Sequence, residues 1–206
     1  MNETDSYEAL VERIEQKAPE YMFLLTAKSL DEFESAFLPI LERAVHHLEA
    51  NAKNFVGLSE VGLTAVLAGS LTIPGMTVTQ ESNSNGHVDL MIKADHCVPM
   101  RHKLGEAKVW NGAEWHLKGL EQLLKRYTTG RETRGLVISY VRLGDIAGLF
   151  KKLREHMDTA LPHQQQKAAG DLALKWSFQT AHAHSCGEVL EVAHVGCNLH
   201  VSTPTA

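Results

Sequence analysis

The apolar positions of the first 55 residues recur every three or four residues, which is the period of an α-helix. One apolar stripe begins at Tyr7, and a longer one predicts an amphipathic helix from about Leu30 to Asn51. Pro39 falls inside the longer stripe, so we expect a kink there or a break into two helices. We interpret residues 1–55 as a helical segment that packs on the core or faces a partner.

Between residues 58 and 141 the hydrophobic pattern changes its period several times. Helical spacing gives way to an alternation of apolar and polar residues, which is typical of half-buried strands, and then returns. The predicted elements are a helix over Leu58–Leu71, strands over Met76–Glu81, His87–Ala94 and Leu104–Trp110, a helix over Trp115–Tyr127 and a strand over Gly135–Val141. A turn over Ser82–Gly86 and a loop through Asp95–Lys103 separate the strands. The order is therefore helix, three strands, helix, strand.

The remainder of the chain predicts one more helix and a strand-rich end. Helical spacing covers Asp145–Met157, and Leu161–Gln166 is a polar connection. Alternating patterns predict three final strands, over Trp176–Ala183, Gly187–Val195 and Cys197–Ser202. Together these elements predict an α/β fold, which we divide into residues 1–55 and a domain over residues 56–206.

The composition is that of an ordinary globular protein. The 206 residues are 44 % hydrophobic and 22 % charged, and no apolar run approaches the roughly 18 residues that cross a bilayer. The first residues are acidic and polar, unlike a secretory signal, so we expect a cytoplasmic protein with no membrane partner. Cys97, Cys186 and Cys197 lie far apart with no Cys-x-x-Cys pair, which indicates free thiols in a reducing compartment.

The charge of the chain bears on its partners. A formal net charge of −5 excludes a protein that is basic overall, although a local basic stripe can still meet phosphates. The candidate nucleic-acid-binding residues are Lys118, Lys125, Arg126 and Arg131, with Arg134 beside them. A solvated helix face explains the same residues, and both interpretations stay open.

Two neighbouring strands carry the charged residues that point to chemistry. Glu106 and Lys108 are two apart on a strand, so both project from one face, whereas the same Glu-x-Lys spacing at Glu15 lies in a helix. Asp89 interrupts an apolar segment, and a carboxylate near a core is costly unless it is paired or binds a metal. The alternative is a cross-strand ion pair of Asp89 with Lys108 or Lys93.

The stretch that holds these residues resembles the PD-(D/E)XK nuclease superfamily in both motif and element order. Asp89 matches that family's acidic residue on the second core strand, and Glu106 with Lys108 matches its acid-x-lysine on the third. Glu60 matches the glutamate that many members carry on the preceding helix, and Gln122–Tyr127 is similar to a glutamine-to-tyrosine motif. The resemblance implies a restriction endonuclease-like αβββαβ core with an N-terminal helical extension and a C-terminal β-hairpin region.

The residues of the motif predict a metal-dependent reaction. The expected catalytic set is Asp89, Glu106, Lys108, Glu60 and Gln122. Mg²⁺ or Mn²⁺ would be held by Asp89, Glu106 and the carbonyl of Ala107, with Glu60 for a second ion or an outer-shell water. Lys108 would orient the attacking water or offset charge on the phosphate. Gln122 and Arg126 either contact the phosphate or are ordinary residues of the helix surface.

The sequence therefore predicts a Mg²⁺-dependent nuclease that hydrolyses phosphodiester bonds of DNA, in bacterial anti-phage defence or restriction. Without a recognisable motor or sequence-reading module, we expect a partner protein or a homo-oligomer. A catalytically inactive nuclease-like subunit for binding or assembly is the alternative. The sequence has no Gly-rich phosphate loop and no Gly-x-Ser-x-Gly elbow, which argues against an NTPase or a serine hydrolase.

Twelve histidines are many for a chain of this length. His182 and His184 share a predicted strand face, and His194 and His200 lie on the strands that follow. They are interpreted either as a zinc site or, more simply, as polar residues on the outer face of a terminal hairpin. The same choice applies to three residues of the inter-strand loop, His96, Cys97 and His102.

Overall fold

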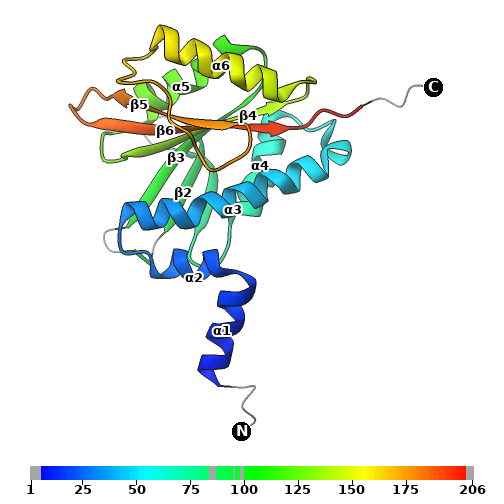
Figure 1. The fold of residues 1–206 in the computed structure, drawn as a ribbon, viewed down its shortest axis with the longest axis vertical. Helices are drawn as coiled ribbons and strands as arrows, with labels where there is room; N and C mark the ends of the chain where they lie inside the picture. Colours follow the sequence, from blue (N-terminus) through cyan, green and yellow to red (C-terminus); the bar gives the residue numbers. More distant parts are fainter. Residues whose placement is uncertain (1–5, 84–86, 95, 98–99, 203–206) are drawn as a thin grey trace.

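The centre of the computed structural model is a six-stranded mixed β-sheet with helices on both faces (Figure 1). The structure describes residues 6–83, 87–94, 96–97 and 100–202. The strands are β1 (Thr77–Asn83), β2 (His87–Ala94), β3 (Arg101–Val109), β4 (Arg134–Val141), β5 (Ser177–Ala183) and β6 (Val189–Asn198). The helices are α1 (Tyr7–Lys17), α2 (Pro19–Thr26), α3 (Leu30–Ala50), α4 (Glu60–Leu71), α5 (Ala113–Gln122) and α6 (Ile146–Ala160).

The strands follow the order β1-β2-β3-β4-β6-β5. The first three form an antiparallel meander, β4 and β6 run parallel to β3, and β5 closes the far edge antiparallel to β6. Helix α5 makes the crossover that parallel neighbours such as β3 and β4 require. The predicted order of helix, three strands, helix, strand is therefore confirmed for the described residues.

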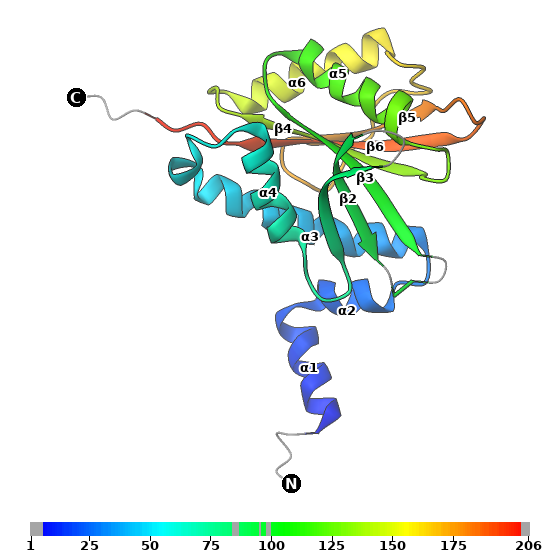
Figure 2. The ribbon, with the colours of Figure 1, turned by 180° about the vertical axis from the view of Figure 1, so that it is seen from behind.

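Two apolar clusters hold the helices against the sheet, one on each face. Helices α3 and α4 pack with the sheet in the first cluster, and α5 and α6 pack with it in the second (Figure 2). Strand β4 is buried along almost its whole length, as its continuous apolar run predicts. Helix α1 extends away from this body, and none of its residues, all of which are described, is buried.

The helix starts follow local capping chemistry that the sequence predicts. Ser59 precedes α4 and its hydroxyl accepts the Gly62 N–H at 3.3 Å, while Asp145 caps α6 by accepting the Gly148 N–H at 3.1 Å. The cap at Ser59 fixes the next residue, Glu60, in the first turn of α4. No helix in the described part of the chain is long and apolar enough to cross a membrane.

Several predicted boundaries are wrong. Helix α3 has nearly its predicted bounds and continues through Pro39, so the alternative of a break into two helices is wrong; the carbonyl that the proline leaves unbonded belongs to exposed Ser35 and can bind water. The two last predicted strands are one strand, β6, which continues through Gly196. A Cβ at Gly196 would lie 2.6 Å from the Phe150 ring, so this glycine permits close packing of α6 and does not end a strand.

Smaller differences concern the segments around β3 and α5. Strand β3 begins at Arg101, within the stretch predicted as a loop. The predicted helix over Trp115–Tyr127 is α from Ala113 to Gln122 and continues as a π-helical turn over Leu123–Tyr127. Residues 84–86 of the predicted turn, and residues 95, 98 and 99 of the predicted loop, lie outside the described residues.

Candidate functional site

The candidate site forms where strands β2 and β3 part. Leu90 and Gly105 are the last described pair of their ladder, so the following N–H groups on that edge of β3 lose their strand partner. The Ala107 N–H donates instead to Asp89 Oδ2 at 2.9 Å, and the Val109 N–H donates to the side chain of Glu60 at 2.7 Å. Two carboxylates thus take the place of a strand backbone.

Lys108 lies in the middle of this arrangement. Its Nζ is 2.6 Å from Glu106 Oε1, 3.7 Å from Glu60 Oε1 and 3.9 Å from Asp89 Oδ2. The four side chains come from α4, β2 and β3, and they were all predicted from the sequence. The structure brings them together as one cluster with three acidic groups around one ammonium.

Glu106 is the most deeply buried member of the cluster, with 1 % of its surface exposed. Its Oε2 atom is buried without a hydrogen-bond partner, which is rare for a carboxylate oxygen. Burial, and next the charge of Asp89, raise the pKa of Glu106 to about 7. Burial lowers the pKa of Lys108, but the hydrogen bond to Glu106 and the surrounding carboxylates outweigh it, so this pKa is raised.

Helix α5 covers the cluster through a glycine that the sequence interpretation missed. A Cβ at Gly119 would lie 3.2 Å from Cγ of both Glu106 and Lys108, so a larger residue would push the helix away from β3. An isolated glycine inside a predicted helix is the available signal for such close packing. Gln122 lies one turn further along α5, and no described hydrogen bond or ion pair joins it to the cluster.

A small hollow adjoins the cluster on the side of α4. Its volume is about 20 Å³ and it is lined by Glu60, Val61, Thr64, Gln80 and Asp89. That is room for one water-sized occupant, next to two carboxylates. Over the described residues, no three His, Cys, Asp or Glu side chains are arranged to hold a metal ion. The Lys108 ammonium lies among these carboxylates.

The predicted nucleic-acid-binding residues are spread along α5 and beyond it. The Lys118 ammonium lies over the Trp115 ring, 4.8 Å from its centroid. Lys125 pairs with Glu121 at 2.6 Å, and Arg126, in the π-helical turn, is exposed. These residues follow one helix, so they form a stripe and not a single patch.

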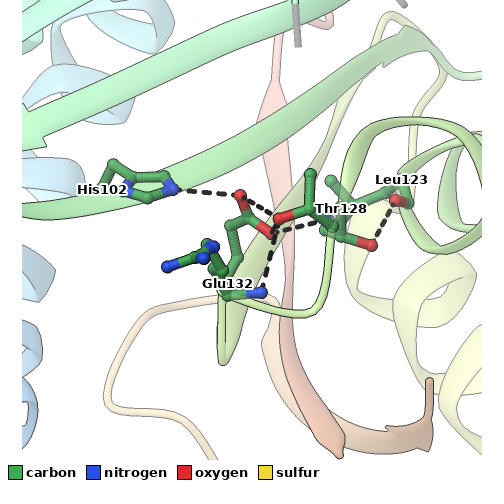
Figure 3. Close-up of polar contacts among 6 residues, drawn as sticks. His102, Leu123, Thr128 and Glu132 are labelled. Atoms are coloured by element: carbon green, nitrogen blue, oxygen red, sulfur yellow. Dashed lines mark hydrogen bonds and ion pairs between the residues drawn. The ribbon is translucent and has the colours of Figure 1, made fainter. Parts of the chain in front are cut away.

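Arg131 lies in the loop that leads into β4, at the end of the strand that is beside the start of β3; Figure 3 shows Glu132 and His102 of this region. Glu132 fixes this loop by accepting hydrogen bonds from the Thr129 N–H at 2.7 Å and from His102 Nε2 at 3.0 Å. Thr128 closes the preceding turn by donating to the carbonyl of Leu123. His102 precedes Glu106 by four residues of β3, which is roughly 13 Å. The structure therefore does not bring Arg131 to the cluster.

His182 and His194 of the terminal strands are buried, so their interpretation as outer-face residues is wrong, whereas His184 is half-buried and His200 is exposed, both just beyond the strands. His182 on β5 and His194 on β6 are each 0 % exposed, and His116 on α5 is 1 % exposed. Strand β6 packs against α3 on one face of the sheet and against α6 on the other. Burial lowers the pKa of His116 to about 3 and that of His182 to about 4, and it also lowers the pKa of His194.

The buried rings belong to one hydrogen-bonded chain. It runs from Ser139 Oγ to His116 (2.8 Å), His194 (2.8 Å), Thr180 Oγ1 (2.7 Å), His182 (2.7 Å) and the carbonyl of His163 (3.1 Å). Because the final carbonyl can only accept, each ring has one N–H donor and one acceptor nitrogen. Every polar atom of the three neutral rings is thereby satisfied without a metal.

The loop histidines do not converge on a metal either. Both ring nitrogens of His96 face carbonyl oxygens, those of Gly75 and Leu24, at 3.0 and 2.9 Å. His102 is bound to Glu132. The three cysteines are free thiols, as predicted, with Cys97 and Cys197 buried and Cys186 exposed.

Fold and site together define a mixed α/β protein with a charged cluster at the parting of two central strands. No family model, curated protein or solved structure matches this chain.

Proposed function

We propose that this protein is a metal-dependent nuclease with a restriction endonuclease-like core that hydrolyses phosphodiester bonds, most simply of DNA. The observation that carries the proposal is the convergence of Glu60, Asp89 and Glu106 on Lys108, within 4 Å of its ammonium. The order of elements around this cluster, and its location where β2 and β3 part, support the same class.

The donor set suits Mg²⁺ or Mn²⁺. Once Glu106 is ionised, three carboxylates against one ammonium leave an excess of two negative charges, and the unpartnered Glu106 Oε2 is a hard oxygen of the kind these ions prefer. Asp89 and Glu106 would hold the ion, and Glu60 would hold a second ion or an outer-shell water. The carbonyl of Ala107 points to the same strand edge as its N–H, which is the side of Asp89, so it is available as a further oxygen.

The chain's own residues would divide the work of hydrolysis. A bound divalent ion polarises the phosphate and favours a hydroxide nucleophile near neutral pH. Lys108 donates a hydrogen bond to an incoming water or to a phosphate oxygen, and its raised pKa keeps it charged for that task. Asp89 and Glu60 are fixed by their backbone hydrogen bonds, so they need little rearrangement. Gln122 would reach the phosphate from α5.

The wider assignment rests on the same proposal. A nuclease of this kind fits a role in bacterial anti-phage defence or restriction, with targeting supplied by a partner protein or a second copy of the chain. The apolar side chains of α1, of which Tyr7 is 80 % exposed, are available for such a contact. Lys118, Lys125 and Arg126 would lie along the nucleic acid.

A second candidate is an inactive subunit for binding or assembly. It is favoured by the 2.6 Å ion pair between Lys108 and Glu106, which a purely structural role would also explain. In that case the cluster would replace the missing strand pairing of β3 and nothing more. The two candidates differ in their response to Mg²⁺.

The test compares cleavage of supercoiled plasmid and of circular single-stranded DNA with Mg²⁺, with Mn²⁺ and with EDTA. We expect cleavage only with metal, and a loss of about a hundredfold or more in Asp89→Asn and in Glu106→Gln, because each removes one of the charges that the metal requires. Glu15→Gln is the matched control, since it alters the exposed Glu-x-Lys pair of α1. Unchanged cleavage in Asp89→Asn would reject the catalytic assignment, and calorimetry that detects no Mn²⁺ binding would favour the inactive subunit.

A further inference from the structure

The indole of Trp115, in the first turn of α5, has no part in the apolar core. Trp115 is 39 % exposed, whereas Trp110 is buried and Trp176 packs against the apolar cluster that α5 and α6 form with the sheet. Lys118 holds the ring from one side, with Nζ 4.8 Å from the centroid. An exposed aromatic face with a cation beside it is unnecessary for folding and is suited to a ligand with a flat, electron-rich surface and a negative charge.

The geometry of α5 directs this pair toward the charged cluster. Successive residues of a helix are about 100° apart, so Gly119 lies between His116 and Trp115 around the helix axis. His116 faces β4 and β6 through its bonds to Ser139 and His194, and Gly119 lies against Glu106 and Lys108 of β3. Going around the helix from His116 to Gly119 to Trp115, the side of α5 turns from β4 and β6 to β3 and then toward β2. Trp115 therefore lies on the side of α5 that is nearest β2.

Asp89 lies on β2, so the indole borders the approach to the cluster. Trp115 is one helical turn from Gly119, whose Cα packs directly on the candidate catalytic side chains. Lys118 and Gln122 continue the same exposed side of the helix by one and two turns. A nucleic-acid strand that placed its scissile phosphate at Lys108 would have the neighbouring nucleotide beside this surface of α5.

We propose that Trp115 and Lys118 form a stacking platform for an unpaired base next to the scissile phosphate, so that the preferred substrate is single-stranded or locally melted nucleic acid. The proposal rests on the nuclease assignment and adds the substrate class to it. Trp115 presents its ring to the base, and Lys118 neutralises the adjoining phosphate. Bases inside a duplex are stacked on both faces and cannot use the platform without being displaced.

The test measures binding apart from cleavage. A fluorescein-labelled oligothymidylate and a duplex of the same length are titrated in EDTA with the full-length protein, and anisotropy reports binding. We expect the wild type to prefer the single strand, and Trp115→Ala to weaken single-strand binding about tenfold or more, since one stacked base contributes that much. Trp115→Phe keeps an aromatic face and is expected to retain most of the affinity, while Lys118→Ala weakens binding and reduces its salt dependence.

Lys175→Ala is the matched control. Lys175 lies over Trp176 at 4.7 Å, the same kind of pair, but beside β5 at the opposite edge of the sheet. This control is expected to bind as the wild type does. Equal affinity of Trp115→Ala and wild type for the single strand, or no preference of the wild type over duplex, would overturn the proposal. If Trp115→Ala loses single-strand binding while Asp89→Asn still cleaves, the stacking platform is supported and the assignment of the catalytic site is rejected. If Trp115→Ala binds as the wild type does while Asp89→Asn no longer cleaves, only the nuclease assignment is supported.

Discussion

At the scale of single residues, Glu106 decides the electrostatics of the candidate site. Its spacing from Lys108 is visible in the sequence, because residues two apart on a strand share a face. Its burial and its unpartnered oxygen are not visible, since they depend on α5, which packs over it through Gly119. The charged members of the site could therefore be predicted, but their protonation states could not.

The raised pKa of Glu106 predicts a pH-dependent contribution to stability. The pKa rises from 4.5 in the unfolded chain to about 7 in the folded protein, so the folded state holds an extra proton between these values. Stability from this group is full below pH 4.5 and is lost as the pH rises through 7, by about 3 kcal/mol in total. Urea unfolding in EDTA should show the wild type losing that amount relative to Glu106→Gln between pH 4.5 and 7.

The same proton also competes with the metal. Since a metal ion requires the ionised carboxylate, Mg²⁺ should stabilise the wild type more at pH 8 than at pH 5, which is the opposite trend from that in EDTA. If the unfolding free energies of the wild type and Glu106→Gln in EDTA change with pH in parallel, the pKa of Glu106 is not raised by its burial.

At the scale of secondary structure, changes in hydrophobic period locate the elements well, because that signal is local. The sequence left open whether the helix breaks at Pro39, and the continuation of β6 through Gly196 could not be predicted, since it depends on a contact with another element. Gly196 packs on Phe150, which comes from α6, and Ser35 happens to face solvent. The burial of His182 and His194 could not be predicted for the same reason, because their hydrogen-bonded chain includes residues of α5, β4, β5 and β6.

The close approach of α5 to β3 predicts opposite effects for two helical glycines. Gly69 in α4 is exposed with open space around it, so Gly69→Ala should raise the free energy of unfolding by about 0.5–1 kcal/mol. Gly119→Ala should not raise the free energy of unfolding in this way, because the added methyl group meets Glu106 and Lys108. The same variant should lower metal-dependent cleavage about tenfold or more. Urea unfolding and plasmid cleavage of both variants provide the comparison. Equal stabilisation with unchanged cleavage in both would refute the packing argument.

At the scale of the whole molecule, the buried histidine chain joins α5, β4, β6 and β5 on one side of the sheet. Its rings accept no proton in the folded state near neutral pH, because burial lowers the pKa of each. Unfolding restores the ordinary value of 6.5, so the unfolded chain binds more protons below that pH. The stability that these rings contribute is present above pH 6.5 and is lost as the pH falls toward 4.

This chain of rings should make acid unfolding steep. Near pH 5.5 three histidines take up protons on unfolding while Glu106 releases one, so about two protons are gained, which corresponds to about 2.5 kcal/mol per pH unit. His182→Gln is the informative variant, because its amide can still donate to the His163 carbonyl and accept from Thr180. Urea unfolding of His182→Gln between pH 5 and 6.5 should show a smaller dependence of the unfolding free energy on pH, because about one proton fewer is taken up on unfolding. An identical slope in variant and wild type would mean that His182 is already charged in the folded protein. Both of its ring nitrogens would then donate, and the hydrogen bonds from Thr180 to Ser139 would run in the opposite direction.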